Sequence, residues 1–461
     1  MRASIPALYG FLLFATIEFA SAQVLYVPGA GINNVPAIVD PDTKTITGFL
    51  QSGENSYKMA VGPGGSRGYI ANLFDRTVEV IDLNSDTRIA TLLTASVPYY
   101  LVLDNSGAHA YVGLASYVQV VDTSTNAITG EIDPFGPVHS LAVSRTLPRL
   151  YIGLPGRVAV VDTTTNSIIS SINTIPTNLL AVAMVPSPDD SKLYVLGRDE
   201  VNESIGFLMT VDLNLGVVTR SLPLGGYLPW DMAITPDGSR IYISFEGPYN
   251  GFTGTLSALD TASGSLIGTV PVFGYAGEMA LAPVGRDLYL AVNEALANVV
   301  DVIDTTTLTI TTRMLMMGGA LDLAFAIPPT YEAEAPGNVL TGKARVVPCP
   351  NCSGGLAVAG VAEPGFGPTG GSLTFNNVAA AAGPQAKLSI YYQHNERSAV
   401  RAAVTVNGVT TILGFPPIPP GTTGFSKVFF TIPGQAIGTI TITGVQGTSA
   451  SSLTIDRVTV Q

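Results

Sequence analysis

Apolar and polar positions follow one another in short runs along most of the chain, and Gly, Pro, Asn and Asp separate the runs. One run, VAVVDTTTN at residues 158–166, is β-branched and apolar and stops at an aspartate followed by a Thr/Asn cluster. Such residues favour strands, and an Asp carboxylate can accept backbone N–H bonds in a tight turn. Close variants occur at 78–82, 118–122, 208–212, 256–260 and 300–304. The pattern therefore predicts a recurring strand that ends in a turn.

A second recurring run contains a tyrosine and precedes each Asp-terminated run. The tyrosines are Tyr26, Tyr69, Tyr111, Tyr151, Tyr194, Tyr242 and Tyr289, at steps of 43, 42, 40, 43, 48 and 47 residues. A run of small and branched residues precedes most of them, and a Thr-rich run follows the aspartate. Four strands in each 40 to 50 residues are typical of a β-propeller with one four-stranded blade per repeat.

The order of the runs also predicts how the ring closes. The chain starts on a Tyr run at residue 25 and leaves the pattern after the small-residue run at 321–325. We therefore predict a seven-bladed propeller over residues 23–327, whose last blade takes strands from both ends. Closure of this kind removes exposed sheet edges.

The runs resemble the YVTN-type β-propeller repeat family in three features. These are the Tyr-Val run, the Val-Ile-Asp run and a Pro-Asp-Gly turn such as 235–238. The resemblance implies the fold, whereas propellers serve as scaffolds, binding platforms and enzymes alike.

Composition supports an all-β chain of more than one domain. Among the 461 residues, 12% are charged and 46% are hydrophobic, with 49 Gly and 32 Pro. The net charge of −12 and only 22 Lys and Arg argue against nucleic acids and anionic membranes as partners.

Residues 1–22 have the pattern of a signal peptide. Arg2 precedes an apolar stretch that ends before Glu18, and Ala20-Ser21-Ala22 is a small-residue cleavage site. The stretch is too short to span a bilayer. We expect a secreted, extracellular protein without membrane insertion.

One face of the propeller should collect the loops that enter each innermost strand and leave each Tyr strand. These loops carry aromatic, cationic and acidic side chains, which suit sugar binding or abstraction of a proton next to a uronate carboxylate. The candidate catalytic residues are His139, Tyr100, Arg157, Arg198, Tyr227 and Glu278. The same loops contribute Tyr57, Lys58, Tyr99, Trp230, Asp231 and Asp322. The alternative is an ordinary binding or structural surface, which we favour.

The repeats stop after residues 328–330, a short proline-containing linker. Residues 331–461 show alternating strands at 371–378, 386–392, 399–406, 425–432, 438–443 and 452–460, which predict a β-sandwich. Both cysteines, Cys349 and Cys352, lie here. In an exported chain we expect them to form a disulfide that shapes one loop. Two thiols cannot fill a four-ligand zinc site.

Several motifs of this segment resemble carbohydrate-binding modules of families 6 and 35. They are YEAE at 331–334, CPNCSGG at 349–355, GSLTFNNV at 371–378, VNG at 406–408 and IDRV at 455–458. The resemblance implies a jelly-roll, galactose-binding-like sandwich that binds polysaccharide and holds a structural calcium. The implied calcium ligands are Glu332, Glu334 and Asp456, whose hard carboxylate oxygens suit that ion.

The sugar site of such a module should lie in loops at one edge. The expected residues are Tyr392, His394, Asn395, Arg397, Asn407, Phe366 and Phe415. Sugars need a flat apolar ring and planar polar groups, but this module has no tryptophan. A sandwich that has lost binding is the alternative.

Three functions follow. The first is a secreted carbohydrate-binding protein that recognises polysaccharide through its C-terminal calcium-containing module, with the propeller as a scaffold. The second is a polysaccharide lyase or glycosidase whose active site lies on the propeller. The third is an extracellular scaffold that binds other proteins.

Overall fold

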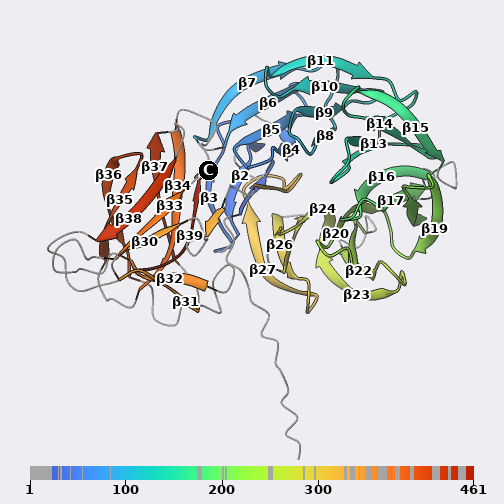
Figure 1. Ribbon diagram of the computed structural model, residues 1–461. Helices are drawn as coiled ribbons and strands as arrows, with labels where there is room; N and C mark the ends of the chain where they lie inside the picture. The colour runs from blue at the N-terminus through green and yellow to red at the C-terminus, as the bar shows by residue number, and fades with distance from the viewer. Residues whose placement is uncertain are drawn as a thin grey trace, which may run out of the picture.

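The computed structural model of the protein is all-β (Figure 1). It describes residues 23–29, 31, 34–41, 43–53, 55–83, 85–173, 179–199, 202, 205–247, 253–283, 286–294, 297–326, 330–332, 338–341, 343–348, 356–361, 371–376, 378, 385–394, 399–417, 426–433, 438–444 and 453–460. None of these residues belongs to a helix long and apolar enough to cross a bilayer.

Repeated four-stranded antiparallel sheets account for the described chain up to Ala326, as in a β-propeller (Figure 1). We number them in chain order. Sheet 1 contains β4 (Ser56–Val61), β5 (Arg67–Asn72), β6 (Thr77–Asp82) and β7 (Thr87–Leu93). Sheet 2 contains β8 (Tyr100–Leu103), β9 (His109–Gly113), β10 (Val118–Asp122) and β11 (Ala127–Ile132). Sheet 3 contains β12 (Ser140–Val143), β13 (Arg149–Leu154), β14 (Arg157–Asp162) and β15 (Ser167–Asn173).

The next three sheets repeat this order. Sheet 4 contains β16 (Leu179–Pro186), β17 (Lys192–Asp199), β18 (Gly206–Asp212) and β19 (Val217–Leu224). Sheet 5 contains β20 (Pro229–Ile234), β21 (Arg240–Phe245), β22 (Thr253–Asp260) and β23 (Leu266–Phe273). Sheet 6 contains β24 (Tyr275–Leu281), β25 (Asp287–Asn293), β26 (Asn298–Asp304) and β27 (Thr309–Met316).

One sheet joins the two ends of this region, and we call it the closing sheet. Its order is β28-β1-β2-β3, made of β28 (Ala324–Ala326), β1 (Val24–Val27), β2 (Ala37–Asp40) and β3 (Thr45–Phe49). Val24 pairs with Ala326, and Tyr26 pairs with Ala324. The prediction that one sheet takes strands from both ends is thus confirmed.

Burial within a sheet depends on the position of the strand. The first strands of successive sheets contact one another, from β28 and β4 through to β24, and so form the inner wall. The third strands β6 and β14 are buried at nearly every position, whereas the outermost β15 is exposed at six of its seven residues. Because neighbouring sheets cover both faces of the middle strands, most of their residues are buried, and the buried Glu79 of β6 is paired with Arg88.

The recurring aspartates close turns, as the sequence predicted. Asp162 Oδ1 accepts the N–H of Thr164 at 2.8 Å, and Asp304 Oδ1 accepts the N–H of Thr306 at 2.8 Å. Hydrogen bonds from Ser124 and Thr125 lower the pKa of the Asp122 carboxyl to about 2.

Three of the recurring tyrosines donate hydrogen bonds to the turn of the following sheet. Tyr111 donates its hydroxyl to Asn166 Oδ1 of the next turn at 2.8 Å. Tyr242 reaches the carbonyl of Thr305 at 3.3 Å, and Tyr289 reaches that of Pro41 in the closing sheet at 3.3 Å. At these three positions, a Tyr strand of one sheet thus contacts the turn after an Asp strand of the next sheet.

Two larger sheets contain the described strands after Thr330. One has the path β31-β32-β39-β34-β37, with β29 paired to β39: β29 (Thr330–Glu332), β31 (Arg345–Pro348), β32 (Leu356–Val361), β34 (Gln385–Gln393), β37 (Ser426–Pro433) and β39 (Leu453–Val460). The other has the order β30-β33-β38-β35-β36: β30 (Val339–Thr341), β33 (Ser372–Asn376), β35 (Val400–Val406), β36 (Val409–Phe415) and β38 (Thr439–Gly444). Apolar side chains from both sheets form one buried core, including Leu388, Ile455, Phe375 and Ile440.

Asp190 provides a test of how the sheets are held together. It lies in the turn before β17 with φ 53°, and its carboxylate accepts bonds from Ser144 Oγ at 2.9 Å and from the N–H groups of Arg145 and Thr146 in sheet 3. Asp190→Ala should lower the free energy of unfolding by about 2–4 kcal/mol, because it leaves buried donors unpaired. Chemical denaturation measures the change.

Two variants sharpen this test. Asp190→Asn keeps one acceptor oxygen and suits the left-handed backbone, so it should cost less. The neighbouring Asp189 caps only its own turn, through Ser187 and Ser191, so Asp189→Ala is the matched control. Equal losses for Asp189→Ala and Asp190→Ala would contradict the cross-sheet role.

Candidate functional site

Charged side chains gather where the innermost strands begin. Lys58 lies in β4, Asp231 in β20 and Glu278 in β24, while Asp322 lies two residues before β28. We call these four residues the axial cluster. Each is followed by Met or Leu and then Ala, so the four residues occupy equivalent positions at the innermost strands of four sheets.

Ion pairs join the axial cluster across the ring. Lys58 Nζ lies 2.6 Å from Glu278 Oε1 and 3.4 Å from Asp322 Oδ1. The three side chains are 15%, 19% and 15% exposed, respectively. The lysine of sheet 1 thus binds carboxylates from sheet 6 and from the segment that leads into the closing sheet.

Irregular strand pairing accompanies these residues. The registers of β4 with β5, β20 with β21 and β24 with β25 all shift at or beside the charged position. Carboxylates satisfy the freed backbone donors: Asp322 Oδ2 accepts the N–H of Met59 at 2.8 Å, and Asp231 Oδ2 accepts that of Met279 at 2.8 Å. Bulges of this kind redirect side chains and are frequent beside functional sites.

The electrostatics of the axial cluster favour a protonated lysine. Burial lowers the pKa of Lys58, but the charges of Asp322, Glu278 and Asp231 raise it by more, so the ammonium is retained. Burial and the charge of Glu278 raise the pKa of Asp231. Burial also raises the pKa of Asp322, although the charge of Lys58 opposes this. Three carboxyl groups thus surround one ammonium, and burial shifts Asp231 and Asp322 toward their neutral forms.

Aromatic rings surround this cluster, and we call Tyr57, Tyr99, Tyr100, Trp230 and Arg198 the aromatic rim. Lys58 Nζ lies 5.9 Å from the Tyr57 ring centre, and Arg198 Cζ lies 5.7 Å from that of Trp230. Both distances are within the range of cation–π attraction. Tyr99 is 37% exposed, with its ring centre 6.4 Å from that of Tyr100. The rim therefore offers flat apolar surface beside charged groups.

The structure brings together three of the six predicted catalytic residues, namely Tyr100, Arg198 and Glu278. Burial raises the pKa of Tyr100 to about 12, and the charges of Glu278 and Arg198 also act on this hydroxyl. Arg157 lies elsewhere and donates Nη2 to the carbonyls of Pro134 and Phe135, both at 2.8 Å.

The other two predicted residues occupy approaches to inner strands. His139 is half-buried, directly before β12, and donates its backbone N–H to Gly153 O at 2.9 Å. Tyr227 is half-buried two residues before β20, and its carbonyl accepts the N–H of Gly247 at 3.3 Å.

Lys58, Asp231 and Asp322 were absent from the predicted catalytic set, although the sequence places them in the same loops. The available signal was a charged residue at the start of a strand that is otherwise small and apolar. Sequence alone does not show that these charges meet, because their pairing depends on closure of the ring.

Three predicted sugar-binding residues are core residues of the C-terminal sheets. Tyr392 and Phe415 are 1% and 0% exposed, with ring centres 4.9 Å apart. His394 is 6% exposed, and its Nε2 lies 3.0 Å from the carbonyl of Phe415. Buried rings cannot stack on a sugar, which corrects the expectation for these residues. Asn407 is exposed, but its φ of 49° and its bond to the N–H of Gly438 give it a role in a turn.

The remaining predicted residues of the C-terminal segment are not described. Phe366, Asn395, Arg397, Glu334, Cys349 and Cys352 lie outside the described residues, as do the side chains of Glu332 and Asp456. Within the described part of the chain, no three His, Cys, Asp or Glu side chains are grouped to hold a metal ion.

Comparison with known proteins shows the fold but no family. No protein-family model and no curated protein matches the sequence. A solved structure described as Kuenenia stuttgartiensis hydrazine synthase has 20% identity and a TM-score of 0.54, covering 59% of this chain and 89% of that chain. A functionally unknown protein from Desulfotomaculum acetoxidans has 15% identity and a TM-score of 0.53, covering 66% and 99%, respectively. At these identities, the likeness shows a β-propeller fold alone.

Removal of the axial lysine should destabilise the ring. Lys58→Met keeps the length of the side chain but leaves the carboxylates of Glu278 and Asp322 without their cation. We expect the free energy of unfolding to fall by roughly 3 kcal/mol at neutral pH. The loss should shrink as the pH falls, because protonated carboxyl groups no longer need the ammonium. Denaturation at several pH values measures both effects.

A more exposed ion pair supplies the control. Lys44 Nζ lies 2.9 Å from Asp287 Oδ2 between the closing sheet and sheet 6, with the side chains 24% and 26% exposed. Lys44→Met should cost less than about 1 kcal/mol. A loss for Lys58→Met that is no larger, or that does not change with pH, would refute the proposed role of Lys58.

Proposed function

We propose that this protein is a secreted carbohydrate-binding protein, in which the seven four-stranded sheets are the blades of one propeller and the C-terminal sheets form a jelly-roll sandwich. The primary site is the aromatic rim above the axial cluster. The observation that carries this proposal is the meeting of Tyr99, Tyr100, Trp230 and Arg198 with a charged, partly exposed cluster on one face.

The chemistry of the rim suits a polyhydroxylated ligand. Sugar rings present a C–H face that packs on aromatic rings, and their hydroxyl groups pair with planar polar or charged groups. Tyr99 supplies exposed aromatic surface, and the Arg198 guanidinium supplies several donors in one plane. Asp231, Glu278 and Asp322 supply acceptors beneath them. A neutral or amino-bearing sugar fits these carboxyl groups better than a uronate, which would add another carboxylate.

The protonation states favour binding over proton abstraction. The pKa of Lys58 is raised, and that of Tyr100 is raised to about 12, so neither group is deprotonated at neutral pH. A general base works best with a pKa near the operating pH. The lyase alternative, which requires such a base, therefore receives little support from this face.

One observation favours a second candidate, a glycosidase. Burial and the charge of Glu278 raise the pKa of Asp231, which is the environment that keeps a general acid protonated. Glycosidases pair such an acid with a second carboxylate. Release of reducing sugar ends by the full protein, and its loss in Asp231→Asn, would support this candidate over binding alone.

We also propose that Glu332, Glu334 and Asp456 of the C-terminal segment hold a structural calcium ion. The strand pairing of this segment supports that proposal. Strands β29 and β39 lie side by side, with Glu332 opposite Arg457, the neighbour of Asp456 in the chain. The two ends of the segment thus come together, as carboxylate ligands from both ends require.

Glycan-array binding by the full protein tests the proposed site. Trp230→Ala and Tyr99→Ala should each weaken binding by about fivefold, the effect of losing one aromatic contact. Phe135→Ala is the matched control, since Phe135 is 78% exposed and lies outside the rim. Unchanged binding in both rim variants would exclude the aromatic rim as the sugar site.

Calcium dependence is tested by thermal unfolding with and without chelator. Calcium should raise the unfolding temperature of the full protein, since an ion that binds only the folded state stabilises it. Glu332→Gln and Asp456→Asn should each reduce the shift. An unfolding temperature that chelation leaves unchanged would contradict the proposal.

A further inference from the structure

Two grooves on the outer wall of the propeller share one construction. We call them the 4/5 groove and the 3/4 groove, after the sheets that they separate. Each lies between the outer strands of one sheet and the Asp turn of the next. In these turns, the N–H of Gly264 bonds to Asp260 O at 2.7 Å, and that of Gly216 bonds to Asp212 O at 2.8 Å. The glycines have φ of 71° and 68°, so the two turns have the same backbone form.

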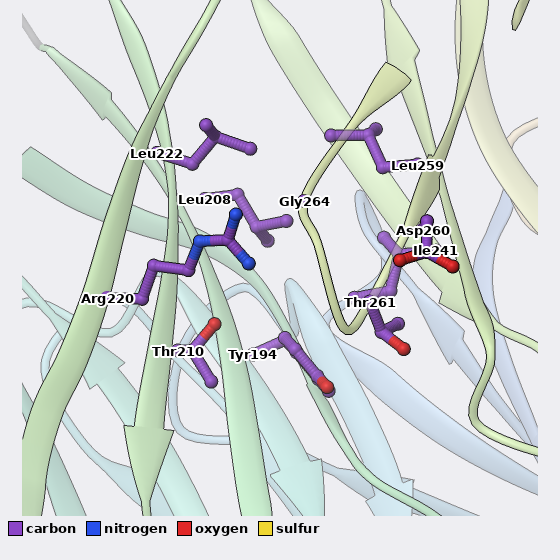
Figure 2. Close-up of a pocket in the computed structure, with 10 residues that line it drawn as sticks. All are labelled: Tyr194, Leu208, Thr210, Arg220, Leu222, Ile241, Leu259, Asp260, Thr261 and Gly264. Atoms are coloured by element: carbon purple, nitrogen blue, oxygen red, sulfur yellow. The ribbon is translucent and has the colours of Figure 1, made fainter. Parts of the chain in front are cut away.

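An arginine fills the 4/5 groove. Figure 2 shows Arg220 extending from its strand toward the turn that carries Gly264. Its guanidinium donates Nη1 to the carbonyl of Ala262 at 3.2 Å and Nη2 to that of Ser263. The remaining cavity is about 10 Å³, hardly enough for one water.

A serine occupies the corresponding position in the 3/4 groove. Arg220 pairs with Thr210 directly before a register shift, and Ser170 pairs with Val160 directly before the same shift in sheet 3. Serine is too short to reach the turn, and a cavity of about 210 Å³ remains. Its lining includes Ile169, Ile172, Leu213, Asn214, Leu215 and Arg149.

The lining of the 3/4 groove suits the side chain that is missing from it. The carbonyls of Asn214 and Leu215 occupy the turn positions that Ala262 and Ser263 hold in the 4/5 groove. Aliphatic walls would pack on the methylene groups of an arginine. A planar guanidinium can donate to two adjacent carbonyls at once, which a compact ammonium does less well.

The charge of Arg149 does not exclude a cation from the groove. Arg149 lies opposite Asp162 in the strand register. The hydrogen bond from Thr164 is the main cause of the lowered pKa of that carboxyl, and the charge of Arg149 adds to it. In sheet 4, Lys192 lies opposite Asp212 in the same register. Arg220 of that sheet nevertheless enters the 4/5 groove. The net charge of −12 also favours cationic partners.

We propose that the 3/4 groove binds an arginine side chain of a partner polypeptide. The guanidinium bonds to the carbonyls of Asn214 and Leu215, and the methylene groups pack on Ile169 and Leu213. The rim is open to a partner, since Ile169 is 52% and Leu215 is 70% exposed. Buried arginines surrounded by apolar contacts are frequent anchors of protein interfaces.

The test uses the full protein with n-propylguanidinium as the probe and saturation-transfer NMR as the readout. The wild type should bind this probe in preference to n-propylammonium. Ser170→Arg places the missing side chain in the groove and should reduce binding at least about tenfold, because the site is then occupied. Ser170→Ala keeps the groove open and should bind as the wild type does.

A second variant separates occupancy from misfolding. Arg220→Ser opens the 4/5 groove and should add a second site for the probe. Ser170→Arg should unfold at the same or a higher temperature than the wild type, since it joins sheets 3 and 4. Equal binding of both probes, or full binding in a folded Ser170→Arg variant, would overturn the proposal.

Discussion

The seam between the two ends of the propeller region is the constraint on which the rest of the structure depends. Among the residues that the structure describes, three pairs join β28 to β1. Additional contacts reinforce the seam: Lys58 meets Asp322 over a sequence separation of 264 residues, and Tyr289 reaches Pro41 over 248. Because such distant contacts form only after a large loss of chain entropy, their strength decides whether the ring is sealed.

The axial cluster connects this stability to function. The same ion pairs that hold sheets 1 and 6 and the closing segment together set the charge of the face above them. They keep Lys58 protonated and leave an excess of carboxyl groups below an aromatic rim. A site that is needed for closure changes little in geometry, which suits recognition of a rigid ligand. Substitutions in the axial cluster should therefore change stability and binding together, whereas substitutions in the rim should change binding without the same change in stability.

Departures from the repeat are more informative about binding than the repeat itself. The Tyr and Asp runs recur because every sheet must contact the next one, and they carry the scaffold. Arg220 occurs at a position where the equivalent residue of sheet 3 is Ser170, and this one difference changes a filled groove into an open one. Local breaks in an otherwise consistent pattern are where function is expected.

The sequence by itself determined the strand order, the period and the turn role of the aspartates, because these depend on local propensity and spacing. It also predicted the pairing across the seam. Only the tertiary structure showed that Tyr111, Tyr242 and Tyr289 bind the next turn, that four charges meet at the axis and that Tyr392, His394 and Phe415 are buried. An alternating strand shows that one face is apolar, but not which loops and sheets cover it. Apart from the seam, which follows from the order of the runs, contacts between residues far apart in the chain depend on how the sheets pack.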